Sequence, residues 1–239
     1  RIRGMVQLTK TDRDYPDNKL TGAEFTVYRD SNGNKELDAD DALVGTLTET
    51  GIGVYEMSDL LYGGYFVKET KAPEGFYLDD NAYYFEIVED GKIVTVENEA
   101  GKGFVNAPQV GSLKIIKTSS DGKVEGFSFR VTGPNGYAGV FTTDKNGEII
   151  IDDLRIGEYV VSEVSDGASS AYVLPADKTA SVFEGAVTKV EMHNELRDTP
   201  KTGDDSNPAR WLALLGVSAA GAAVLGVVGF RKRRKEGAE

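Results

Sequence analysis

The sequence predicts an all-β protein made of two tandem antiparallel β-sandwich domains, followed by one C-terminal transmembrane helix. Three observations indicate this fold class. Short runs rich in Val, Ile, Tyr and Phe alternate with turn sequences such as Asp90-Gly91 and Asn146-Gly147, which is typical of β-sandwiches. The pattern of these runs occurs twice along the chain. A single uncharged apolar run, residues 211–230, lies near the C-terminus.

An internal repeat defines the two domains. Residues 53–70, GVYEMSDLLYGGYFVKET, align without gaps on residues 147–164, GEIIIDDLRIGEYVVSEV. Self-similarity of this kind indicates two copies of one domain. We therefore predict sandwich one over residues 5–107 and sandwich two over residues 111–196.

Three strands of each domain are expected to carry a polar residue on the face that points to the core. Successive side chains of a strand point to opposite faces, so residues two apart share a face. In the first strand, for example, Val6 and Leu8 share a face with Lys10. The six polar residues selected in this way are Lys10, Glu69 and Asn106 in the first domain and Lys117, Glu163 and Asn194 in the second.

A lysine, an acid and an asparagine that meet in a dry core can react with one another. Burial disfavours both charged forms, which leaves the lysine as a nucleophilic amine and the acid protonated. The amine of Lys10 can then attack the carboxamide carbon of Asn106, while Glu69 polarises the carboxamide oxygen and moves protons. Ammonia leaves and an amide crosslink remains. Each domain therefore reacts only once, and only between its own residues.

A simpler interpretation of the same residues needs no chemistry. Lysines and acids at strand ends can extend to solvent or form ordinary ion pairs. The sequence alone leaves both interpretations open, more so in the second domain.

Both domains resemble the Cna B-type or SpaA-like domains of Gram-positive pilins and surface adhesins, which have an Ig-like or prealbumin-like fold. The motifs that carry this resemblance are QLTKTD around Lys10, KIIKTS around Lys117, YFVKETKAPEGF at residues 65–76, YVVSE at residues 159–163, and the closing Asn106 and Asn194. The resemblance implies Lys–Asn isopeptide bonds, with Glu69 and Glu163 as the promoting acids. The second domain departs from the pattern after Glu163.

The C-terminal segment resembles an LPxTG sorting signal. Thr199, Pro200, Lys201, Thr202 and Gly203 form the motif, with Thr199 where the family usually has Leu. A spacer within residues 197–210, the apolar run 211–230 and a basic tail 231–239 follow in the expected order. The resemblance implies cleavage by a sortase after Thr202 and transfer to a peptidoglycan cross-bridge or to another pilin subunit. The alternative is a simple single-pass membrane anchor.

The composition is that of a surface protein. The formal net charge is −12, which argues against nucleic acid as a partner, and the chain contains no Cys. With a single histidine and no cysteine, the sequence predicts no zinc cluster and no recognisable catalytic triad. We therefore expect no enzymatic activity on external substrates and no required cofactor.

A loop inserted in the first domain resembles a calcium-binding loop. Oxygen-bearing side chains fall at positions 1, 3, 5, 9 and 12 of residues 30–41, but Lys35 replaces the usual glycine. The alternative is a solvated acidic turn. The candidate ligands for Ca²⁺ are Asp30, Asn32, Asn34, Glu36, Asp38 and Asp41.

Together these features predict a cell-wall-anchored structural surface protein, either a pilin subunit or an adhesin stalk, that passes through a membrane-bound precursor. A shaft pilin often presents an acceptor lysine in a Tyr-Pro-Lys setting, whereas this chain has Tyr15-Pro16-Asp17. The alternative is the stalk of a ligand-binding adhesin, or of a wall-tethered enzyme, whose functional domain lies upstream of Arg1. In the adhesin case a host surface ligand is a further partner.

Overall fold

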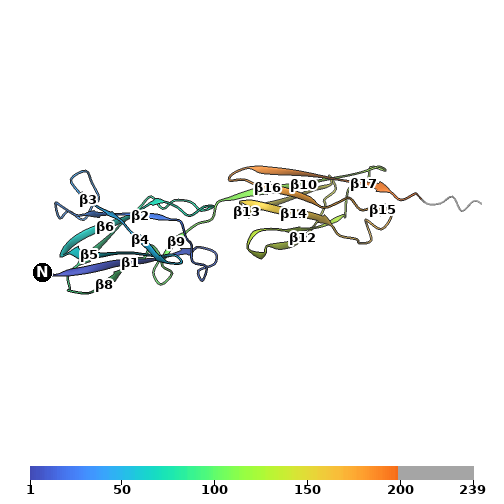
Figure 1. The fold of residues 1–239 in the computed structure, drawn as a ribbon. Helices are drawn as coiled ribbons and strands as arrows, with labels where there is room; N and C mark the ends of the chain where they lie inside the picture. The colour runs from blue at the N-terminus through green and yellow to red at the C-terminus, as the bar shows by residue number, and fades with distance from the viewer. Residues whose placement is uncertain (199–239) are drawn as a thin grey trace, which may run out of the picture. The chain divides into compact units, whose positions relative to one another are not determined.

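The computed structural model describes residues 1–198, and residues 1–196 form one compact unit. This part of the chain is built from β-strands, with a single short 3₁₀ helix (Figure 1). The predicted all-β class is confirmed. The sorting motif, the apolar run 211–230 and the basic tail lie outside the described residues. Within residues 1–198, no helix is long and apolar enough to span a membrane.

The first sandwich is formed by nine strands in two sheets. One sheet has the order β4-β5-β1-β8, with β9 also paired to β1, and the other has the order β3-β2-β6-β7. The strands are β1 (Arg3–Asp12), β2 (Glu24–Arg29), β3 (Ala42–Thr46), β4 (Thr48–Gly51), β5 (Val54–Leu61), β6 (Gly63–Lys71), β7 (Ala82–Ile87), β8 (Ile93–Thr95) and β9 (Phe104–Asn106).

The second sandwich repeats this plan with two four-stranded sheets, ordered β13-β10-β17-β15 and β12-β11-β14-β16. Its elements are β10 (Val110–Ser119), β11 (Ser128–Thr132), η1 (Pro134–Gly136), β12 (Ala138–Thr142), β13 (Glu148–Arg155), β14 (Gly157–Glu163), β15 (Tyr172–Val173), β16 (Lys178–Val182) and β17 (Val187–Leu196).

Each sandwich has its own apolar core, because strand alternation sends one set of side chains inward. Several aromatic rings pack together in the first core, where the Phe25 ring lies edge-on against Tyr55 and Phe104 at centroid distances of 5.1 and 4.9 Å. The second core is centred on Phe127, Phe129 and Tyr159, which are fully buried.

The sequence predicts antiparallel sandwiches, and most strand pairs are antiparallel, but β1 pairs in parallel with β8 and β9, and β10 with β17. The first strand of each domain lies parallel to its last strand: β1 pairs with β9, and β10 pairs with β17. The chain crosses between the two sheets several times and ends each domain in the sheet of its first strand, running in the same direction as that strand. Hydrophobic alternation reports which face of a strand is buried but carries no information on strand direction, so the sequence could not reveal this pairing.

A buried ion pair connects the second sandwich to β1. The Arg155 guanidinium donates to both carboxylate oxygens of Asp12 at 2.7 Å, and to Asp14 at 2.9 Å. The side chain of Asp12 is fully buried, and that of Arg155 is 15% exposed. Although burial raises the pKa of Asp12, its hydrogen bonds with Arg155 hold that pKa below the ordinary value.

Arg155→Met is expected to lower the free energy of unfolding by about 3 kcal/mol or more, because it leaves the Asp12 carboxylate buried without a counter-charge. Urea unfolding monitored by tyrosine fluorescence measures the loss. Arg130→Met removes an exposed arginine from the same domain and should change the free energy by less than about 0.5 kcal/mol. Equal effects of the two substitutions would contradict the prediction.

Candidate functional site

The first domain gathers Lys10 from β1, Glu69 from β6 and Asn106 from β9 in its core. The side chains of Lys10 and Glu69 are fully buried, and Nζ of Lys10 lies 3.6 Å from Oε1 of Glu69. Nδ2 of Asn106 donates to both carboxylate oxygens of Glu69 at 2.9 Å. The expectation that these three side chains point inward is confirmed by their burial.

Strand register and one glycine position the lysine. The parallel pairing of β1 with β9 sets Lys10 opposite Phe104, and Nζ of Lys10 donates to the Phe104 carbonyl at 2.8 Å. The backbone N–H of Lys10 donates to the Gly53 carbonyl at 2.7 Å. Gly53 has φ of +64°, and a Cβ there would lie 3.0 Å from the Lys10 carbonyl oxygen, so this contact requires glycine.

Burial moves the two ionisable groups toward their neutral forms. Desolvation lowers the pKa of Lys10 from 10.5 to about 8, although the charge of Glu69 opposes the shift. Desolvation likewise raises the pKa of Glu69 above 4.5, against the opposing effects of the Asp79 N–H and of Lys10. The pair therefore shares its proton more evenly than the same groups would in water.

The hydrogen bonds alter one detail of the predicted chemistry. The sequence predicts that Glu69 polarises the carboxamide oxygen of Asn106. In the structure Glu69 instead accepts from the carboxamide nitrogen, and Oδ1 of Asn106 has no hydrogen-bond partner. In the predicted reaction that nitrogen would leave as ammonia, so this contact would suit Glu69 to protonate the leaving group rather than to polarise the carbonyl.

The second domain brings together the same three residue types in a different arrangement. Nδ2 of Asn194 on β17 donates to Oε1 of Glu163 on β14 at 2.6 Å. Nζ of Lys117 on β10 donates to the carbonyl of Thr118 at 2.5 Å and lies 4.2 Å from the Phe127 ring centroid. Among the ion pairs of residues 1–198, none joins Lys117 to Glu163.

The pKa values of the lysine and the glutamate in the second site shift in the same directions as those in the first. Burial lowers the pKa of Lys117 and raises that of Glu163. Two buried oxygens, Oε2 of Glu163 and Oδ1 of Asn194, have no hydrogen-bond partner. The second site is therefore buried like the first, but its amine is not held against its acid.

Comparison with known proteins identifies the fold family. A family model described as the SpaA prealbumin-like fold domain matches residues 4–100 and 111–196, which is most of the chain. The chain belongs to this family. The first match ends six residues before Asn106, but β9 closes the first SpaA domain in the structure.

The individual relatives are distant, and some of them are much longer than this chain. The Bacillus anthracis TIE protein superposes with a TM-score of 0.62 at 25% identity, covering 81% of this chain and 34% of that chain. Colossin-A of Dictyostelium discoideum is 23% identical over 173 residues, covering 66% of this chain and 1% of that protein. GBS52, a minor pilin of Streptococcus agalactiae, gives a TM-score of 0.38 at 19% identity, covering 83% of this chain and 98% of that chain.

Several polar side chains of the inserted loop in the first SpaA domain form hydrogen bonds within the loop. Oδ2 of Asp38 accepts from the amides of Asn32 at 3.1 Å and Asn34 at 2.7 Å, and Asp30 accepts from the Gly33 N–H at 2.7 Å. Asp41 accepts from the Ser31 N–H at 3.0 Å. Within residues 1–198, no group of three or more His, Cys, Asp or Glu side chains forms a metal cluster. The calcium site stays a prediction.

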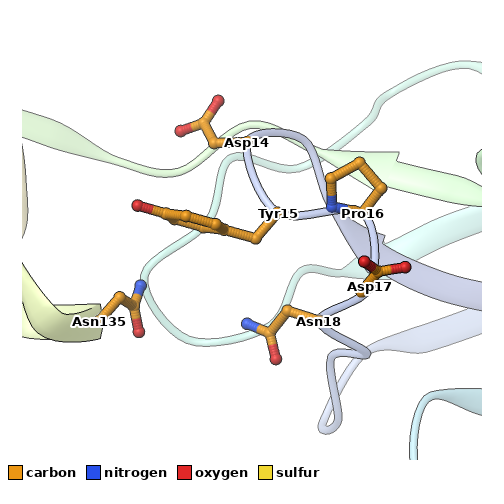
Figure 2. A pocket seen from close by; sticks show the side chains of 6 residues that line it. All are labelled: Asp14, Tyr15, Pro16, Asp17, Asn18 and Asn135. Carbon is orange, nitrogen blue, oxygen red and sulfur yellow. The ribbon is translucent and has the colours of Figure 1, made fainter.

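The Tyr15-Pro16-Asp17 segment forms a turn after β1, closed by a 2.8 Å hydrogen bond from the Asn18 N–H to the Tyr15 carbonyl. This turn and Asn135 line a pocket of about 590 Å³. Figure 2 shows the side chains of the turn together with that of Asn135 around the pocket. The position that would hold a lysine in a Tyr-Pro-Lys setting is Asp17. No amine is therefore available from this motif.

Two further polar residues, which the strand pattern does not predict, lie beside the first site. Asp79 precedes β7, and Asn98 lies between β8 and β9. The backbone N–H of Asp79 donates to Oε2 of Glu69 at 2.8 Å, and Asn98 donates to the Asp79 carboxylate at 2.9 Å. Both residues lie outside the strands, where alternation gives no signal.

In an Asn106→Ala variant, which has no carboxamide to react with, stability is expected to rise between pH 8 and 10.5. The folded state binds the Lys10 proton less tightly than the unfolded state, so burial of the ammonium destabilises the fold below about pH 8. That penalty is relieved as the pH approaches 10.5. The 2.5-unit difference corresponds to about 3 kcal/mol.

Urea unfolding at several pH values measures this change. The matched control is the double variant Lys10→Met with Asn106→Ala, in which the other lysines titrate equally but the buried amine is gone. Parallel stability curves for the two proteins would show that Lys10 titrates normally.

Proposed function

We propose that this chain is a structural protein of the Gram-positive cell surface, a pilin subunit or adhesin stalk, whose SpaA domains are closed by Lys–Asn isopeptide bonds. The observation that carries the proposal is the fully buried contact of Lys10 with Glu69 and of Glu69 with Asn106. An ordinary strand-end lysine would extend to water, whereas this amine is buried in the core against Glu69, which in turn contacts Asn106.

The reaction balances within three side chains. The neutral amine of Lys10 attacks Cγ of Asn106, a bond forms between Nζ and Cγ, and the bond between Cγ and Nδ2 breaks. The nitrogen leaves as ammonia, and Glu69 passes it the proton that the amine gives up. The fold supplies proximity and shifted pKa values, and each domain reacts once. The same reaction is proposed for Lys117, Glu163 and Asn194.

The bond gives the domain mechanical resistance. Because β1 and β9 are parallel neighbours at the start and end of the domain, a crosslink from Lys10 to Asn106 carries tension past all of the strands between them. It also restricts the unfolded chain, which for a loop of this size contributes about 4 to 5 kcal/mol in the chain-entropy model. In a chain without cysteine, the isopeptide bond would supply the covalent stabilisation that disulfides give other exported proteins.

The C-terminal motif supplies the attachment in this proposal. A sortase would cleave after Thr202 and transfer the chain to an amine of the peptidoglycan cross-bridge or of another pilin subunit. The order of motif, apolar run and basic tail in the sequence supports this step. The acidic net charge of −12 is consistent with a solvated surface protein.

The second candidate is the stalk of a ligand-binding adhesin or of a wall-tethered enzyme. The chain spans about a third of the length of the TIE protein and a hundredth of Colossin-A. SpaA domains thus occur as parts of much longer proteins, and in such a protein these two domains would present a separate functional domain.

The intact mass of residues 1–203 tests the crosslinks, because each isopeptide bond removes one ammonia, about 17 Da. We expect a deficit of two ammonias. Lys10→Met and Lys117→Met should each lose one of the two bonds, and Glu69→Gln should leave the first domain linear because it removes the acid.

Lys114→Met is the matched control, since Lys114 lies on β10 but pairs with Glu148 outside the site. It should retain both deficits. A parental mass equal to that of the linear chain would refute the crosslink proposal for both domains.

A further inference from the structure

We propose that Asp79 and Asn98 are positioning residues that hold the acid and the electrophile of the first domain in their reacting arrangement, and that the second domain therefore crosslinks more slowly. This inference rests on the proposed function. It assigns a role to residues outside the Lys–Glu–Asn set and predicts a difference in rate between the two domains.

Asp79 fixes the acid. Its backbone N–H donates to Oε2 of Glu69 at 2.8 Å, so that oxygen is oriented by the loop that follows β6. Oε1 of the same carboxylate faces Nζ of Lys10 at 3.6 Å, and both oxygens reach Asn106. Rotation of the Glu69 carboxylate would break the contact with Asp79 along with those to the two reacting groups.

Asn98 fixes the strand that carries the electrophile. Its side chain binds the backbone of Val105 twice, accepting from the Val105 N–H at 2.6 Å and donating to the Val105 carbonyl at 2.8 Å. Val105 is the residue next to Asn106 on β9. The side chain of Asn98 therefore holds one edge of this three-residue strand while β1 pairs with it on the other.

A single hydrogen bond joins these two supports. Nδ2 of Asn98 donates to Oδ2 of Asp79 at 2.9 Å, and the Tyr83 hydroxyl donates to the same oxygen at 2.7 Å. Tyr83 in turn packs edge-on against Phe104, whose carbonyl accepts from Lys10. The loop that orients Glu69 and the strand that presents Asn106 are thus tied together through Asp79.

The Asp79 carboxylate also influences the proton balance of the site. Although burial raises its pKa, hydrogen bonds from Asn98, Tyr83 and Asn81 hold that pKa below the ordinary value, so the group stays charged. Its negative charge raises the pKa of Glu69, which favours the protonated acid that delivers a proton to the leaving group. The same charge raises the pKa of Lys10 and so opposes the neutral amine, whose formation is driven by burial.

The second domain shows what the site looks like without such support. Oε2 of Glu163 has no hydrogen-bond partner in the described part of the chain, whereas both carboxylate oxygens of Glu69 accept hydrogen bonds. Lys117 donates to the neighbouring Thr118 carbonyl instead of facing its acid. Since an error of about 1 Å in the placement of reacting groups can cost about a hundredfold in rate, this looser site should react later than the first.

The test is a pulse-chase of cell-free translation of the full chain, in which gel mobility and intact mass report ammonia loss over time. In a Lys117→Met background, only the first domain can react. We expect Asp79→Ala and Asn98→Ala each to slow its crosslinking by about tenfold to a hundredfold. Asp79→Asn keeps an oxygen for Asn98 and Tyr83 and should recover part of the rate. In a Lys10→Met background, the second domain should react more slowly than the first.

Loss of stability is separated from loss of positioning by a matched variant. Leu60→Ala opens a cavity in the same core, away from the network. Thermal unfolding in an Asn106→Ala background ranks the three alanine variants without any crosslink. If Leu60→Ala lowers the melting temperature as much as Asp79→Ala but crosslinks at the parental rate, the positioning role of Asp79 is supported.

Parental crosslinking rates for both Asp79→Ala and Asn98→Ala, or slowing no greater than that of Leu60→Ala, would overturn the inference. A Lys117→Met protein that never loses ammonia would instead refute the proposed function, and this inference with it.

Discussion

The burial of one lysine amine against one carboxylate is the interaction on which the first domain depends. An unpaired ammonium in an apolar core would cost several kcal/mol, so Lys10 is tolerable only with Glu69 and the Phe104 carbonyl around it. That requirement explains the local structure: the parallel pairing of β1 with β9, the glycine at position 53 and the aromatic wall of Phe104 all serve to bring the amine to this place. If the isopeptide bond forms, the cost of burying charge disappears, because an amide carries none.

The two SpaA domains differ in how the glutamate of the site is held: Glu69 accepts a hydrogen bond from the Asp79 N–H, whereas one oxygen of Glu163 has no partner. They share strand order, the glycine that approaches the lysine backbone, and a direct hydrogen bond from asparagine to glutamate. They differ in the segment after the glutamate, where the first domain supplies Asp79 and the second supplies no partner for Oε2 of Glu163. Divergence in a loop has thus altered the geometry of a site whose three principal residue types are unchanged.

Alternation along strands was sufficient to predict the burial of all six candidate residues, because a polar residue in register with apolar ones must either be buried with a partner or lie at a strand end. It could not find Asp79, Asn98 or the Arg155–Asp12 ion pair, since these contacts join loops or strands that are distant in sequence. Alternation also carries no information on strand direction, so the parallel pairing could not be predicted from it. The spacing of Asp30, Asn32 and Asn34 resembled a metal loop, yet the same oxygens also serve as hydrogen-bond acceptors within a turn.

The measurement that tests the mechanical claim most directly is single-molecule stretching of residues 1–198 from the two ends. If Lys10 and Asn106 are joined, the segment between them is bypassed and contributes no extension at any force below bond rupture. In Lys10→Met the same segment should unfold and add roughly 300 Å of contour length. An unfolding step of that length for the first domain of the parental protein would contradict the account.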